Sequence, residues 1–289
     1  AQSETVWRQA DKYHVPRIVY INKFDRVGAD FDKTVASIRE KLGARPALVQ
    51  LPIGKEDSFI GINDVLEAKK YLFTDPTGET FETLDLTSDE MALVVKAREN
   101  LIEAVADVDD EALDEYVSTG TVDLSHLKPA IRRATIANLL VPVFVGSSFR
   151  NKGIQPLLDG IVDYLPSPLD VKPAVGKIPG TDEVVEVKSD INGPLVALVF
   201  KIVADPYVGI LSYVRVYSGV MKSSSYVVNA NKNDKQRVSR LLRMHANKRE
   251  DIEELGAGDL GAIVGSRDVI TGTTLCEEGK IVQLETMHF

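Results

Sequence analysis

The chain has 289 residues, of which 44% are hydrophobic and 27% are charged, as in folded proteins that are long enough for two domains. Its formal net charge of −9 excludes tight binding of nucleic acid through overall charge alone. The single cysteine, Cys276, excludes an internal disulfide and a cysteine-based metal cluster, and it fits a reducing compartment.

The first 60 residues alternate between helical and strand-forming patterns. Apolar residues recur three or four positions apart in the helical stretches, whereas the expected strands are a short β-rich run and a mostly apolar, buried one. The expected helices are residues 3–13 and 30–42, and the expected strands are residues 17–21 and 46–53. Such alternation predicts a parallel sheet covered by helices. Because the chain opens on a helix with no strand before it, we expect an internal segment of a longer protein.

Residues 61–140 form an acidic segment in which helical signals dominate. Ser88 is the expected helix cap, with Glu90 shortly after it. The apolar stripe of this helix would be Met91, Val94, Val95, Leu101, Ile102 and Val105. The charged run at 107–111 favours a solvated face, with a docking surface for a partner as the alternative. We interpret 61–140 as an insertion into the sheet domain.

The α/β pattern returns at residues 141–168 and gives way to a second domain. A strand is expected at 141–145, and a helix at 153–165 would turn inward Ile154, Leu157, Leu158, Ile161 and Leu165. Residues 169–192 are rich in Pro, Gly, Asp and Lys and are expected to be a linker. Residues 193–289 then show short β-rich runs between turns, which predicts a small β-barrel.

The tetrapeptide Asn22-Lys23-Phe24-Asp25 stands directly after the strand at 17–21. Ligands of open parallel sheets bind at the carboxyl ends of strands. One carboxylate can accept both N1–H and the exocyclic amine of guanine, so Asp25 is expected to select guanine over adenine. Lys23 would lay its alkyl stem across the base, and Asn22 would fix the loop by side-chain hydrogen bonds.

A second loop, Gly146-Ser147-Ser148-Phe149, follows the strand at 141–145 in the same way. Ser147 is expected to hold Asp25 in place, and the backbone N–H of Ser148 to donate to the guanine carbonyl oxygen. Phe149 completes this loop and is counted with the residues expected to bind the base. Either loop alone fits ordinary turn chemistry, but two of them at equivalent strand ends, flanking an insertion, favour a shared site for the base.

Several runs of residues resemble elongation factor G. In the sheet domain they are residues 2–10, 15–18, 21–26, 146–159 and 163–168. In the expected barrel they are residues 205–209 and 215–219. The resemblance covers nearly the whole chain, and residues 37–54 are similar to the organellar second paralogue of that factor.

The resemblance implies an α/β fold, namely a partial P-loop-type GTPase sheet with a helical insertion, followed by a β-barrel domain. Residues 1–60 would be the C-terminal, guanine-reading part of the GTP-binding domain, and 141–168 would be its end. Residues 193–289 would be the second of five domains. Ser148 stands where the family usually has alanine, and a role of its backbone amide is unaffected by that difference.

The resemblance also implies ligands and partners. The intact protein would bind GTP or GDP with Mg²⁺ and act on the ribosome as a monomer, in the cytoplasm or, alternatively, the mitochondrial matrix. Its barrel would touch small-subunit RNA, and the acidic insertion would meet a stalk protein. No apolar run approaches the roughly 20 residues that cross a bilayer, so no membrane partner is expected.

The phosphate-binding half of such a site is expected to lie upstream of these residues. The loop G-x-x-x-x-G-K-[ST] is absent, since Lys55, Lys177 and Lys280 each follow a glycine but precede neither Ser nor Thr. This segment alone is therefore expected to have no catalytic residue and no metal ligand, and to bind nucleotide weakly without hydrolysis. The four histidines are assigned to the surface or to packing: His14, His126, His245 and His288.

Basic residues gather near the end of this otherwise acidic chain: Lys232, Lys235, Arg237, Arg240, Arg243, Lys248 and Arg249. They indicate either phosphate contacts with ribosomal RNA or a solvated barrel edge. Two classes of function stay open. One is a ribosomal GTPase for translocation, with recycling, release-type and ribosome-protection factors as rivals. The other is a non-hydrolysing ribosome-binding module.

Overall fold

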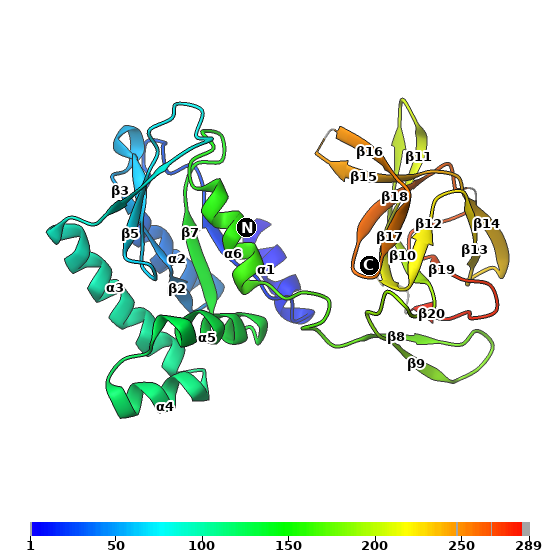
Figure 1. Ribbon diagram of the computed structural model, residues 1–289, viewed down its shortest axis with the longest axis horizontal. Helices are drawn as coiled ribbons and strands as arrows, with labels where there is room; N and C mark the ends of the chain where they lie inside the picture. The colour runs from blue at the N-terminus through cyan, green and yellow to red at the C-terminus, as the bar shows by residue number, and fades with distance from the viewer. Residues whose placement is uncertain (1, 247, 267, 285–289) are drawn as a thin grey trace. The chain divides into compact units, whose positions relative to one another are not determined.

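The computed structural model describes residues 2–246, 248–266 and 268–284, which divide into two compact units. The first unit runs to Pro166 and the second begins at Ser167 (Figure 1). The first unit combines helices with two sheets, and the second consists of strands. The predicted fold class, a GTPase-type α/β domain followed by a strand domain, is confirmed, and the strand domain is a curled antiparallel sheet.

The central sheet of the first unit is parallel, with the strand order β1-β7-β2. Its strands are β1 (Val19–Ile21), β7 (Val141–Val145) and β2 (Pro46–Leu48). Ile21 pairs with Val145, so the last residues of β1 and β7 lie side by side. The two loops that follow these strands therefore emerge together, as the sequence predicts.

Three helices accompany this sheet: α1 (Gln2–Lys12), α2 (Phe31–Leu42) and α6 (Ile154–Tyr164). The ends of α2 follow from local chemistry. Asp30 accepts a hydrogen bond from the backbone N–H of Lys33 at 2.9 Å, which caps the first turn. Gly43 ends the helix at a φ of 63°, in the left-handed region that glycine adopts without strain.

The predicted inward face of α6 is wrong in part. Leu158 and Ile161 are 55% and 40% exposed, whereas Pro156, Gly160 and Tyr164 are buried. A Cβ on Gly160 would lie 2.1 Å from the ring of Phe144, so this glycine is what lets the helix approach β7 closely. Packing on a small residue has turned the larger apolar side chains toward the outside.

The stretch at 46–53 forms two strands rather than one. The chain leaves the parallel sheet after β2 and enters an antiparallel sheet with the order β3-β4-β5-β6. Its strands are β3 (Gln50–Ile53), β4 (Gly61–Asp64), β5 (Lys69–Leu72) and β6 (Glu82–Asp85), and a short 3-10 turn covers Glu56–Ser58. The insertion is thus not purely helical. The turn after β4 is held by the Asp64 carboxylate, which accepts from Leu66 N and Glu67 N, both at 2.8 Å.

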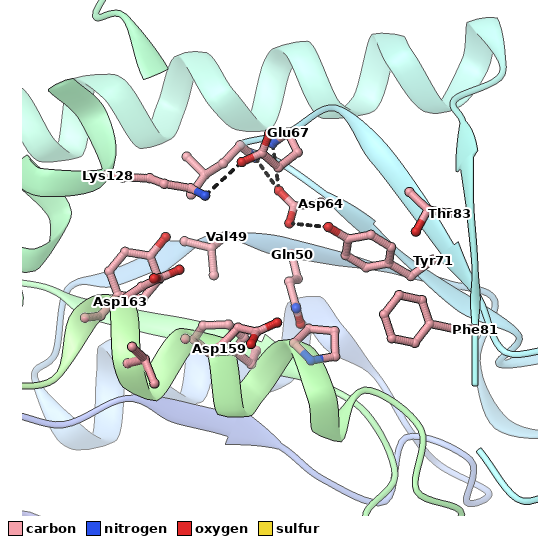
Figure 2. A pocket seen from close by; sticks show the side chains of 16 residues that line it. Val49, Gln50, Asp64, Glu67, Tyr71, Phe81, Thr83, Lys128, Asp159 and Asp163 are labelled. Carbon is pink, nitrogen blue, oxygen red and sulfur yellow. Dashed lines mark hydrogen bonds and ion pairs between the residues drawn. The ribbon is translucent and has the colours of Figure 1, made fainter. Parts of the chain in front are cut away.

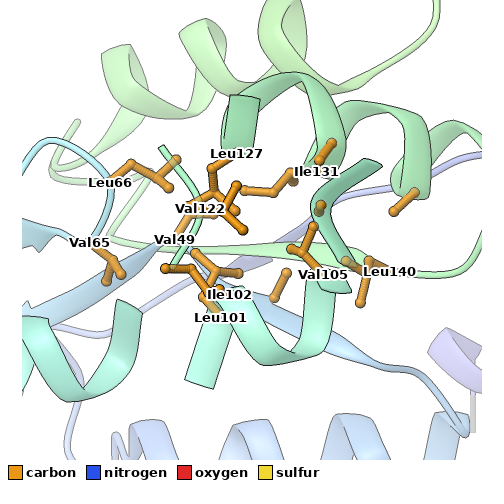
Figure 3. Close-up of a cluster of buried hydrophobic side chains, with 14 of the residues drawn as sticks. Val49, Val65, Leu66, Leu101, Ile102, Val105, Val122, Leu127, Ile131 and Leu140 are labelled. Atoms are coloured by element: carbon orange, nitrogen blue, oxygen red, sulfur yellow. The ribbon is translucent and has the colours of Figure 1, made fainter. Parts of the chain in front are cut away.

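Three helices complete the insertion: α3 (Ser88–Ala106), α4 (Asp110–Thr119) and α5 (Leu124–Ile136). The cap of α3 is Thr87 rather than Ser88, because Thr87 and Glu90 form a reciprocal capping box. Figure 3 shows the cluster that joins these helices to the sheets, including Val49, Leu101, Val105, Leu127 and Ile131. Of the predicted stripe, Met91 and Val95 are exposed and the other members are buried.

The acidic run at 107–111 is not simply a solvated face. Asp109 is only 8% exposed and pairs with Arg133 through bonds of 2.8 and 2.9 Å. It also caps α4 by accepting from Ala112 N at 3.0 Å. The Arg133 guanidinium is the largest cause that lowers the pKa of Asp109. One carboxylate of the run thus has a structural role.

The second unit holds an eight-stranded antiparallel sheet with the order β14-β13-β19-β10-β11-β18-β15-β16. These strands are β10 (Val196–Asp205), β11 (Gly209–Ser218), β13 (Ser225–Asn229), β14 (Asp234–Val238), β15 (Leu241–His245), β16 (Lys248–Ile252), β18 (Leu260–Val264) and β19 (Thr274–Cys276). A separate pair is formed by β12 (Val220–Lys222) and β17 (Glu254–Gly256).

The segment at 169–192, expected as a linker, carries structure of its own. It contains β8 (Ala174–Lys177) and β9 (Val184–Val187), which form a three-stranded sheet with β20 (Gln283–Leu284). Buried Val187 and Leu284 pack with Cys276, so the segment shares a core with the strand unit. Its turn-forming residues lie between strands rather than in an open connection. No helix among the described residues is both long and apolar enough to cross a bilayer.

Candidate functional site

Two loops meet where β1 and β7 end. Gly146 N donates to Ile21 O at 3.0 Å, and Phe24 N donates to Gly146 O at 3.1 Å. These bonds extend the pairing of the strands into the loops. Residues 22–25 and 146–149, far apart in sequence, therefore form one backbone platform.

The side chain of Asn22 ties the two loops together. Its Oδ1 accepts from Lys23 N at 2.8 Å, from Ser148 N at 2.9 Å and from Ser148 Oγ at 3.0 Å. Lys23 has a φ of 60°, a strained value for a residue with a side chain, and the bond to Asn22 helps to hold it there. Asn22 thus has the loop-fixing geometry that the sequence predicts.

Asp25 presents a mostly buried carboxylate beside this platform, with 13% of the side chain exposed. The nearby Ser147 hydroxyl is the largest cause that holds the pKa of Asp25 below its usual value, and partial burial opposes it. The Ser147 hydroxyl is nevertheless buried with no hydrogen-bond partner within 3.5 Å among the described residues. A small movement of either side chain would complete the bond between them, and we take Asp25 to be ionised.

Buried packing holds the first loop from below. Phe24 is 2% exposed, and its ring centroid lies 5.3 Å from that of Phe59 and 6.4 Å from that of Phe31. In the second loop, a Cβ on Gly146 would meet Lys152 O at 2.2 Å and the Tyr20 hydroxyl at 2.3 Å. Only glycine fits this close approach.

The backbone amide of Ser148, predicted to donate to a guanine carbonyl, has a protein acceptor in the structure. It already donates to Asn22 Oδ1, so a guanine carbonyl would have to share or replace that acceptor. Phe149 is 82% exposed and packs on no described core cluster. Its side chain is free to contact a ligand.

Two further residues adjoin the site without having been predicted. The Arg150 guanidinium lies 3.8 Å from the Asp25 carboxylate. Glu56 donates its N–H to Phe24 O at 3.0 Å and accepts from Gly28 N at 2.8 Å, so it holds both ends of the first loop. No motif marks Glu56, because its role depends on contact between segments about 30 residues apart.

The basic residues that the sequence groups together are divided between the two ends of the sheet order in the strand unit. Lys235 and Arg237 lie on β14 at one edge of the sheet order, whereas Arg243, Lys248 and Arg249 lie on β15 and β16 at the other. Three members have carboxylate partners: Lys235 with Glu278, Arg240 with Asp251 and Arg249 with Asp205.

Among the described residues, Lys232, Arg237, Arg243 and Lys248 are exposed and form no ion pair. His126 lies 2.7 Å from Glu115, His245 lies 3.7 Å from Glu250, and His14 sits in a turn, so these three fit the surface assignment. His288 lies outside the described residues. The described part of the chain contains no cluster of three or more His, Cys, Asp or Glu side chains that could hold a metal.

Family comparisons agree with this architecture. Residues 1–167 match the elongation factor Tu GTP binding domain, and residues 209–276 match elongation factor Tu domain 2. The first match covers more than half of the chain. The chain therefore belongs to the translational GTPase family defined by the elongation factor Tu GTP-binding domain.

A solved structure is similar to this chain along most of its length. The chain is similar to the crystal structure of ttk003000868 from Thermus thermophilus, with a TM-score of 0.76 and 26% sequence identity. The similarity covers 96% of this chain and 38% of that one. The chain thus spans about two fifths of the length of the protein it matches.

Proposed function

We propose that the protein is a GTP-binding translation factor resembling elongation factor G, which couples GTP hydrolysis on the ribosome to movement of tRNA and mRNA. Family membership supports the GTPase class. The observation that carries the guanine assignment is the shared platform, in which Asn22 Oδ1 accepts from both loops beside the ionised carboxylate of Asp25.

In this proposal Asp25 reads the base. Its carboxylate accepts from N1–H and the exocyclic amine of guanine, whereas adenine would present an acceptor there and leave the carboxylate unpaired. Ser147, with its buried and unpartnered hydroxyl, orients Asp25. The alkyl stem of Lys23 covers one face of the base. The N–H of Ser148 turns from Asn22 to the guanine carbonyl when the base enters.

GTP or GDP is the proposed ligand, and the described residues fit its base. They supply no Mg²⁺ ligand set, so Mg²⁺ and the phosphates would be held by other parts of the protein. The base site contributes affinity and selectivity rather than a chemical step. We therefore assign no catalytic residue in this chain.

The strand unit is proposed to contact small-subunit ribosomal RNA. The cations that form no ion pair, above all Arg243 and Lys248 on neighbouring strands, are the best phosphate ligands of the predicted group. The acidic insertion is proposed to meet a stalk protein. We propose that the factor works as a monomer in the cytoplasm, with the mitochondrial matrix as the alternative, and buried free Cys276 suits a reducing compartment.

The test is the binding of GTP and xanthosine triphosphate to the protein and to its Asp25→Asn variant. Asparagine accepts only one guanine donor and offers an amine to the other, so GTP affinity should fall by roughly 10²-fold or more while that for the xanthine nucleotide rises. Asp57→Asn is the matched control. Asp57 is an exposed carboxylate that lines one cavity together with Asp25, and no role in reading the base is proposed for it.

If neither nucleotide binds the unmodified protein, the guanine assignment is overturned. The non-hydrolysing ribosome-binding module then becomes the better proposal. If both nucleotides bind and selectivity is unchanged in Asp25→Asn, the base lies elsewhere. Translocation and ribosome recycling are separated by assaying the protein on ribosomes before and after termination.

A further inference from the structure

A second cavity of about 580 Å³ lies within the first unit, apart from the guanine-binding platform (Figure 2). Strands β3, β4 and β5 and the helices α5 and α6 supply most of its lining. None of Asn22, Asp25, Ser147 and Ser148 lines it. The volume suits a ligand group as large as an amino-acid side chain with its adjoining backbone.

The lining carries more negative than positive charge. Four carboxylates face one ammonium group, and Lys128 is already paired with Glu67 at 2.8 Å. Asp64, Asp159 and Asp163 have no cationic partner within 4 Å among the described residues. Burial raises the pKa of Asp64, which is the direction expected for a carboxylate that lacks a cation.

Aromatic rings form the walls between these carboxylates. Tyr71 and Phe81 have ring centroids 5.1 Å apart, and Phe144 and Tyr164 have centroids 6.3 Å apart. Six Lys or Arg side chains lie over aromatic rings elsewhere in the described residues, yet none lies over these four rings. Phe144 and Tyr164 are buried in the core, so the accessible ring surface is that of the half-buried Tyr71 and Phe81. The cavity thus offers ring surface and carboxylates to a ligand, and its one cation, Lys128, is paired with Glu67.

A buried amide adds an independent sign of a ligand. Gln50 is 2% exposed and its Oε1 accepts from Val145 N at 3.1 Å, which fixes the orientation of the amide. The Nε2 group has no hydrogen-bond partner among the described residues, and the side chain lines the cavity, as Figure 2 shows. Because this donor faces the cavity, a ligand that fills the cavity has to supply an acceptor for it, which a simple amine or metal ion would not provide.

We propose that this cavity binds an arginine residue of another polypeptide. The planar guanidinium has five donors for the carboxylates and a flat face for the rings, which fits this lining better than a lysine ammonium does. A carbonyl of the same polypeptide would accept from Gln50 Nε2. The proposal does not depend on the guanine site, which uses other residues.

The test is a titration of the protein with N-acetyl-L-argininamide at low salt, followed by calorimetry and by the NMR signals of the Gln50 side-chain amide. We expect saturable binding and a shift of those signals. Asp159→Asn should weaken binding severalfold, and the pair Asp64→Asn with Asp159→Asn should weaken it about tenfold or more, since charged hydrogen bonds are lost. Asparagine at 64 keeps the oxygen that accepts from Leu66 N and Glu67 N, so the turn should fold.

Asp114→Asn is the matched control, because Asp114 is an exposed carboxylate on α4 outside the cavity. Asp25→Asn should also leave this binding unchanged, which separates the proposal from the guanine site. Absence of saturable binding, or equal binding by the carboxylate variants, would overturn the proposal. Agmatine is the comparison for a free organic cation. If it binds as tightly as the argininamide and leaves the Gln50 signals in place, the polypeptide assignment is wrong.

Discussion

Replacing Glu56 with alanine should loosen the first loop of the proposed guanine site without unfolding the unit. The Glu56 carboxylate accepts from Gly28 N at 2.8 Å, and alanine removes that charge-assisted bond. The bond from Glu56 N to Phe24 O uses the backbone and survives the change. Because the lost bond is solvent-exposed, we expect a cost of about 1 kcal/mol, or roughly a fivefold change in an equilibrium constant.

The assay is hydrogen exchange of the Gly28 amide, with guanine-nucleotide affinity as the second readout. Gly28 should exchange about fivefold faster in Glu56→Ala, and affinity should fall by a similar factor if loop order limits binding. Glu56→Gln keeps an acceptor and should lie close to the unmodified protein, and Asp57→Ala should change neither quantity. Unaltered protection of Gly28 in Glu56→Ala would refute the reasoning.

Three other substitutions test separate parts of the structure. Gly146→Ala should destabilise the second loop by about 2 kcal/mol and weaken nucleotide binding, measured by urea unfolding and titration, because its Cβ would meet backbone at 2.2 Å. Asp109→Ala should lower the free energy of unfolding by about 2 kcal/mol by removing a helix cap and the partner of the half-exposed Arg133. The pKa of Asp109 is lowered, so this stabilisation is fully present above the usual carboxyl pKa of about 3.9 and is lost as pH falls through the lower folded value. Unfolding measured at several pH values would reveal this pH dependence. Asp109→Asn, which has no carboxyl group to titrate, should abolish it. Lys248→Gln should weaken binding to small ribosomal subunits and lower its salt dependence by about one counterion, whereas Arg240→Gln, which removes a cation already paired with a carboxylate, should change it less.

Local chemistry predicts much of the fold. The helix at 31–42 is bounded by Asp30 and Gly43, whose capping roles are set by residue type and position. Strand β7 begins and ends where its apolar run does.

Features that depend on tertiary packing are not visible in the sequence. The chain switches sheets at Val49, a buried apolar residue of a type common in strands, so its identity does not mark the break. The outward turn of Leu158 follows from the contact between Gly160 and Phe144, which lie on different elements. In the sequence, Asp109 is one of several adjacent acidic residues. Its structural role follows from the contact with Arg133, which lies on a later helix.

The candidate site shows the same division. The residue types and the strand ends predict that Asn22, Asp25 and Ser147 lie together, and they do so in the structure. Other contacts depend on the path of the loops through space. They are the approach of Arg150 to Asp25, the bond from Gly28 to Glu56, and the bond from the Ser148 amide to Asn22. Spacing in the sequence carries no information on those paths.

The unpartnered hydroxyl of Ser147 links base binding to the order of the site. A buried hydroxyl without a partner costs about 1–3 kcal/mol, and the carboxylate that would satisfy it is Asp25. A guanine that draws both Asp25 oxygens into a fixed position would also bring that carboxylate into line with Ser147. Binding of the correct base would then recover the cost, whereas adenine, which offers no donor pair to Asp25, would not. In the proposed site, selectivity would therefore arise from the pair of side chains as well as from direct contact with the base.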